Sequence, residues 1–89
     1  MRDEMEELLK EELRTLAIRT RDRLDYKQKQ MAEALEMSDS SYSDIETGEH
    51  MCGTLTAVLL LMLQPDPNEY LRSLERKFQK LHDRAGQLI

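Results

Sequence analysis

Residues 28–48 read QKQMAEALEMSDSSYSDIETG, and this stretch decides the fold. The apolar residues of its first half stand three and four residues apart, at Met31, Ala32 and Leu35. That spacing is the helical period. Ser38 is a residue type that caps helix N-termini, and Gly48 stands where a helix commonly ends. We therefore predict two short helices, over about 27–36 and 39–47, joined by a tight turn.

The sequence on either side of this stretch also follows the helical period. A long first helix is predicted over 3–24. Thr54 is expected to cap a fourth helix over 55–63, which is apolar on almost every side. Asp66 is expected to cap a fifth helix over 67–87, with a proline at its first position. Five helices with short joints and no strands predict an all-α fold.

Length and composition fit one small domain over residues 1–89. The chain is 39% hydrophobic and 35% charged, and three Gly and two Pro are too few for a β-rich chain. The single cysteine, Cys52, excludes an internal disulfide framework and a zinc site built on several cysteines. The longest apolar run, 57–63, has seven residues and is too short to span a bilayer. We expect a soluble, cytoplasmic helical protein without a membrane segment.

Residue patterns typical of catalysis are missing from the sequence. It has no Ser/His/Asp arrangement of recognisable spacing, no glycine-rich phosphate loop and no paired-carboxylate signature. His50 and Cys52 flank one residue of a predicted loop, but two ligands do not make a metal site. The sequence therefore predicts no enzymatic activity, no cofactor, no metal and no small-molecule site.

The stretch 28–48 resembles the helix-turn-helix of the phage repressor/Cro type, the XRE-like family of DNA-binding proteins. The matching positions, in register and without a gap, are Gln28, Met31, Ala32, Leu35, Met37, Ser38, Tyr42, Ser43, Ile45, Glu46 and Gly48. The resemblance implies a five-helix, lambda-repressor-like domain whose first and last helices are long. It extends over about 16–78, leaving 1–15 as an N-terminal helical extension and 67–87 as the C-terminal helix.

A second correspondence lies outside the motif. The family often carries an Arg on its first helix, seven residues before the motif Gln, that pairs with the Glu of Glu-x-Gly. Arg21 and Glu46 occupy those places here. The resemblance therefore implies an ion pair in which a guanidinium fork ties the first helix to the end of the third.

The resemblance also implies that the third helix lies in the DNA major groove. Its candidates for meeting base edges are Asp39, Ser40, Ser43 and Asp44. The two carboxylates depart from the family, because a carboxylate can accept only from cytosine N4 and is repelled by phosphates. Asp39 either complements the positive end of the helix dipole or reads a base. Asp44 is either a solvated side chain or a specificity element that faces cytosine or a partner's basic group.

Phosphate contacts are expected from the side chains at the end of the first helix and the start of the second. These candidates are Arg19, Arg23, Lys27, Gln28 and Lys29. Gln28 has a competing use, because Asp25 stands three residues earlier and the two could form a capping box. The alternatives for Gln28 stay open at this point.

The predicted function is sequence-specific binding of double-stranded DNA as a small, repressor-like transcriptional regulator. Charge favours a competing hypothesis, a protein-interaction module that keeps this fold but has lost DNA affinity. Residues 26–53 hold two basic and six acidic side chains, so they carry −4 of the chain's net −5. Negative charge at the motif opposes DNA binding.

A homodimer is predicted through the fifth helix, with help from the fourth. The interface candidates are Leu59, Met62, Leu71, Leu74, Phe78 and Leu81. The fourth helix is apolar all round, and the fifth carries an apolar seam from Leu71 to Leu88, more than one small core can cover. In the competing arrangement, the fifth helix packs within one chain on an apolar stripe of the first helix, made of Met5, Leu9, Leu13 and Leu16.

Overall fold

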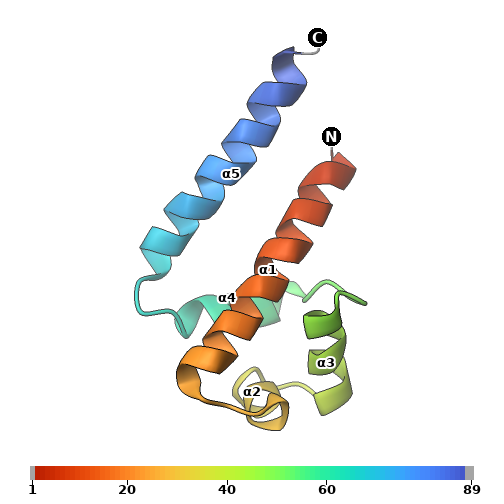
Figure 1. The fold of residues 1–89 in the computed structure, drawn as a ribbon, viewed down its shortest axis with the longest axis vertical. Coiled ribbons are helices and arrows are strands. Elements are labelled where there is room, and N and C mark those ends of the chain that lie inside the picture. The colour runs from red at the N-terminus through yellow and green to blue at the C-terminus, as the bar shows by residue number, and fades with distance from the viewer. Residues whose placement is uncertain (1, 88–89) are drawn as a thin grey trace.

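The computed structural model describes residues 2–87, with the side chains of residues 2–83. Five helices make up this part of the chain, and it contains no strand (Figure 1). They are α1 (Arg2–Leu24), α2 (Gln28–Ala34), α3 (Asp39–Thr47), α4 (Thr54–Met62) and α5 (Pro67–Gln87). The predicted all-α fold is confirmed. None of these helices is both long enough and apolar enough to cross a membrane.

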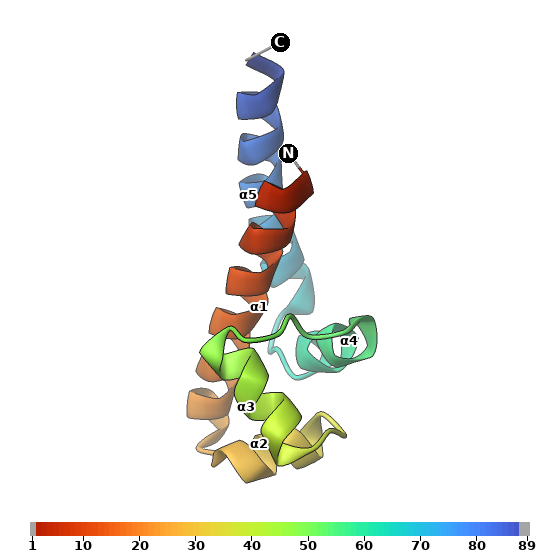
Figure 2. The same cartoon turned by 90° about the vertical axis from the view of Figure 1, so that its right-hand side faces the viewer.

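The two long helices, α1 and α5, run antiparallel beside each other, and the three short helices gather at one end of the pair (Figures 1 and 2). In this arrangement α1 is the helix that contacts α3, α4 and α5. It therefore connects the helix-turn-helix at one end of the molecule to the C-terminal helix at the other.

The core lies where α1 meets the short helices. Its buried apolar side chains are Leu13, Leu16, Ala17, Met31, Ala32, Leu35, Tyr42, Ile45 and Leu60. The apolar positions predicted to face inward on the two motif helices are all in this set. Each buried aliphatic or aromatic side chain contributes about 1.5–3 kcal/mol to folding, so the motif is held by packing against α1.

The predicted ends of α3 are confirmed. Ser38 Oγ accepts a hydrogen bond from the Ser41 N–H at 3.2 Å. Gly48 takes a left-handed conformation with φ +83°, which a glycine adopts without steric cost. Asp66 also caps α5 as predicted, since its Oδ1 accepts from the Glu69 N–H at 3.1 Å.

The predicted capping box of Asp25 and Gln28 is wrong. Asp25 adopts a left-handed φ of +55° and ends α1, while the Tyr26 N–H donates to the Arg21 carbonyl at 3.0 Å. The cap of α2 lies two residues further on, at Lys27, whose N–H donates to Gln30 Oε1 at 2.8 Å. Asp25 is used to stop one helix and so is not available to begin the next.

Two other predicted helix ends are also corrected. The second helix ends at Ala34 rather than near Glu36, because Glu36 takes a left-handed φ of +55° and the Met37 N–H closes the end on the Ala32 carbonyl. Thr54 is the first residue of α4 rather than its cap, since Gly53 holds the extended capping position.

The apolar surface of α4 and α5 is covered only in part. On α4, Leu60 is buried, but Leu55 is 67% exposed and Met62 is 71% exposed. On α5, Leu71 is exposed, whereas Leu74, Phe78 and Leu81 are half-buried. The arrangement with α5 beside α1 in the same chain therefore exists and leaves one face of α4 open. The far end of the predicted seam, Leu88, lies outside the described residues.

Candidate nucleic-acid interface

The outward face of α3 carries the side chains that were predicted from the sequence to contact base edges. Asp39 and Ser40 are exposed, and Ser43 and Asp44 are partly exposed. At 100° per residue these positions cover one side of the helix, while the buried Tyr42 and Ile45 cover the other. The structure thus brings the four candidates together on a free helical face.

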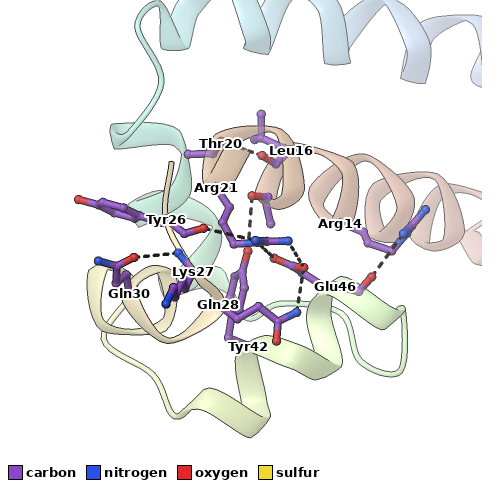
Figure 3. A network of polar contacts seen from close by, with 11 residues as sticks. Arg14, Leu16, Thr20, Arg21, Tyr26, Lys27, Gln28, Gln30, Tyr42 and Glu46 are labelled. Atoms are coloured by element: carbon purple, nitrogen blue, oxygen red, sulfur yellow. Dashed lines mark hydrogen bonds and ion pairs between the residues drawn. The ribbon is translucent and has the colours of Figure 1, made fainter. Parts of the chain in front are cut away.

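The ion pair between Arg21 and Glu46 is present (Figure 3). Arg21 Nε lies 2.7 Å from Glu46 Oε2, and its Nη2 lies 3.2 Å from Oε1, so the guanidinium meets the carboxylate with two parallel hydrogen bonds. The Glu46 side chain is only 7% exposed. A bidentate pair with one partner this deeply buried fixes the orientation of α3 relative to α1.

Gln28 joins the same network and does not form the predicted capping box with Asp25. Its Nε2 donates to Glu46 Oε1 at 3.1 Å (Figure 3). Burial alone would raise the pKa of the Glu46 carboxyl, but hydrogen bonds from Arg21, Tyr42 and Gln28 outweigh burial and hold that pKa below its ordinary value. Gln28 is therefore a positioning residue that joins α2 to the pair between α1 and α3.

Arg14 is a contributor that the sequence reasoning missed. Its Nη1 donates to the Glu46 backbone carbonyl at 3.3 Å (Figure 3). Its Nη2 lies 2.7 Å from Glu11 Oε1. The cation therefore meets the negative end of the α3 dipole. A signal was available, because Arg14 precedes Arg21 by seven residues and two helical turns return to the same face of α1.

The structure separates the cationic phosphate candidates into two groups. Lys27 and Lys29 are exposed at the start of α2. Arg19 and Arg23 each stand two residues from Arg21, which places them about 200° around α1 from the side that faces α3. Both line a cleft with residues of α5, and Arg23 Nη2 donates to the Leu63 carbonyl. Of these four candidates, only the two lysines lie at the start of a helix of the motif.

The chain around the motif is strongly acidic. No Lys or Arg occurs from Gln30 to Leu71, a stretch that holds eight Asp and Glu residues. The loop that follows α3 begins with Glu49 and His50, and His50 Nε2 lies 3.8 Å from Asp44 Oδ2. Positive charge beside α3 therefore comes from the start of α2 and from α1 rather than from the loop after Gly48.

Comparison with known families agrees with this geometry. Residues 18–61 match the family model described as Helix-turn-helix, which covers the ion pair, α2, α3 and most of α4. No curated protein and no solved structure matches the chain. The matched family consists of DNA-binding regulatory domains and is not a family of enzymes. Residues 18–61 are therefore a helix-turn-helix domain of the XRE-like family, and the chain is a DNA-binding helix-turn-helix regulator.

Proposed function

We propose that this protein is a sequence-specific, repressor-like transcriptional regulator that reads double-stranded DNA with α3. The observation that carries the proposal is the free face of α3. It presents Ser40, Ser43 and Thr47, small hydroxyl side chains that leave room for close approach to base edges. The buried side of the same helix is fixed by the network around Glu46.

Asp39 and Asp44 give this face a chemical preference. A carboxylate accepts hydrogen bonds, and in the major groove the amino group of cytosine N4 is the donor that suits it. Every other base edge offers these oxygens an acceptor or a less favourable donor, and the phosphates repel them. We therefore expect cytosine in the operator opposite Asp44, and a low affinity for duplexes that lack it.

Lys27 and Lys29 are the proposed contacts to backbone phosphate. Both are exposed on the α2 side of α3. Phosphate contacts set the register of a protein on the duplex but carry no sequence information. Arg19 and Arg23 are left out of the proposed interface because they lie on the other side of α1.

We also propose that the protein is cytoplasmic and binds DNA as a homodimer, in the manner of a small phage-type repressor. Leu55, Val58 and Met62 stand at spacings of three and four on α4 and form a stripe in which each side chain is 48% exposed or more. Leu71 on α5 is a further exposed apolar side chain. Of the predicted interface residues, Leu59 packs against the core instead. A two-fold axis would set two copies of α3 about 34 Å apart.

A fluorescence titration of the full chain against labelled DNA from upstream of its own gene tests the function. A non-cognate duplex of equal length is the control, and both are measured over a salt series. We expect affinity for the upstream DNA to exceed that for the control, and both to fall as counterions are released. Equal affinity for both duplexes, or none at low salt, would overturn the proposal and favour a protein-interaction module.

A further inference from the structure

A polar cleft lies on the side of α1 that faces away from α3. It is formed by α1, the α4–α5 turn and the first half of α5, with a volume of about 430 Å³. A pocket of several hundred Å³ takes a whole small molecule rather than a single ion. No local sequence pattern indicates this cleft, because its walls come from segments about fifty residues apart.

Three arginines line this cleft: Arg19 and Arg23 from α1, and Arg76 from α5. Within the described part of the chain, no carboxylate lies within ion-pair distance of any of the three. Arg23 donates one hydrogen bond, from Nη2, to the Leu63 carbonyl. The acidic residue of the lining, Glu69, is already engaged by Arg72 at 3.2 Å. The cleft therefore concentrates positive charge in a chain whose net charge is −5.

The uncharged part of the lining combines apolar residues, among them Leu16 and Pro65, with several polar groups. Ser73 offers a hydroxyl from α5. Gln64 donates to Thr20 Oγ1 at 2.8 Å and to the Leu60 carbonyl at 2.9 Å, which holds the floor of the cleft in place. The walls thus provide three exposed cationic forks above a floor braced by Gln64.

We propose that this cleft binds the phosphate group of a small phosphorylated metabolite. A phosphomonoester carries close to two negative charges and three terminal oxygens. Guanidinium forks match those oxygens bidentately, and arginines from two different helices can engage one phosphate together. The remaining volume would hold the polar organic body of the ligand, beside Ser73 and Gln64.

The phosphates of DNA are a second source of the same chemistry, but the geometry separates the two. A duplex docked on α3 lies beside Arg14 and Arg21, about 200° around α1 from Arg19 and Arg23. The proposed ligand is thus bound independently of the operator, and the inference holds whether or not the proposed DNA reading is correct.

The test follows backbone NMR signals of the full chain during titration with inorganic phosphate, ribose 5-phosphate or ribose at constant ionic strength. We expect saturable shifts around Arg19, Ser73 and Arg76 with both phosphates, tighter binding of ribose 5-phosphate, and no shift with ribose. A DNA duplex should instead shift the signals of α3.

Variants decide whether the arginines carry this binding. Arg19→Gln and Arg76→Gln should each weaken ribose 5-phosphate binding by about tenfold or more, because each removes hydrogen bonds to a charged group. Lys80→Gln is the matched control, since it removes one exposed positive charge from α5 outside the cleft. Arg76→Lys keeps the positive charge but loses the guanidinium fork. Its affinity for ribose 5-phosphate should lie between that of Arg76→Gln and that of the unmodified chain.

Three results would overturn the proposal: no saturable binding of either phosphate, equal weakening by Lys80→Gln, or shifts centred on α3 instead of the cleft. Tighter binding of inorganic phosphate than of ribose 5-phosphate would contradict the metabolite and leave a simple ion. Circular dichroism of each variant confirms that the helices are intact, so that lost binding is read as a lost contact.

Discussion

Lys77 on α5 and Glu12 on α1 form an ion pair across 65 residues of sequence, with 2.6 Å between Nζ and Oε1. The Glu12 side chain is 17% exposed, so one partner is largely withdrawn from water. This contact joins the two antiparallel helices at one position and so favours one register of α5 along α1. Among the side chains that the structure describes, it is the one ion pair between α1 and α5.

Replacing either partner of this pair, by Glu12→Gln or Lys77→Gln, should lower the free energy of unfolding by up to about 1 kcal/mol. Arg2→Gln is the control, since it breaks a fully exposed pair with Glu6 and should leave stability unchanged. Urea unfolding of the single and double variants measures the coupling. Additive effects of Glu12→Gln and Lys77→Gln would show that the pair does not stabilise the fold.

Breaking the pair between Arg21 and Glu46 should cost far more. Arg21→Ala or Glu46→Ala leaves the remaining charge without its partner in a mostly buried place, and we expect a loss of about 3 kcal/mol. Ser40→Ala, on the outward face of the same α3, should change stability little. A double-mutant cycle with no coupling between residues 21 and 46 would contradict the assigned role.

The same pair predicts how stability depends on pH. Because the pKa of Glu46 is lower in the folded chain than its ordinary value of 4.5, the unfolded chain takes up a proton first as pH falls. The stabilisation is fully present above pH 4.5 and is lost as pH falls through the folded pKa. Urea unfolding from about pH 7 to about pH 3 should therefore show the stability gap between the unmodified chain and Glu46→Gln narrowing on acidification. A gap that stays constant would refute the linkage.

DNA binding should respond differently to changes on α3 and on α2. Asp44→Asn removes a charge at nearly constant shape, so the preferred base opposite it should change. Lys27→Gln and Lys29→Gln should weaken binding to all sequences alike. Each should also reduce the slope of log affinity against log salt concentration by about one. Binding to a library of operator variants measures both effects. If Asp44→Asn changed neither affinity nor preference, the docking of α3 would be wrong.

The proposed dimer predicts a concentration-dependent mass. Sedimentation equilibrium at micromolar concentration should show a species above the 10.5 kDa of one chain. Met62→Glu, at a position that is 71% exposed, should return it to the monomer without unfolding. Leu60→Ala, at a buried position, should instead lower stability by about 2–5 kcal/mol. A 10.5 kDa species at every loading would rule out the dimer.

The sequence was most informative where structure is decided locally. Ser38 and Gly48 cap the two ends of α3 through contacts within a few residues. Residue type alone was therefore enough to predict where this helix begins and ends. The inward face of α2 followed from spacing, because a helix returns to the same side every three or four residues. The Arg21–Glu46 pair needed the resemblance, since 25 residues separate its partners.

Other features depend on contacts that no local pattern contains. Gln28 matched a local capping pattern with Asp25, yet Glu46 from 18 residues further on takes its amide. The sequence pattern predicts a helix start at Asp25, but Asp25 ends α1, because both uses favour the same residue type. The cleft of Arg19 and Arg76 exists only once α5 returns along α1.

The absence of Lys and Arg from Gln30 to Leu71 has a consequence for how this regulator would search a chromosome. Affinity for random DNA rests almost wholly on phosphate contacts, and these let many regulators slide along the duplex between sites. With Lys27 and Lys29 as the proposed phosphate contacts, and Arg21 already engaged by Glu46, we expect brief visits to random sequence and little sliding. Few copies would then be held on the bulk of the genome, and occupancy of the operator would follow the free concentration of the protein closely.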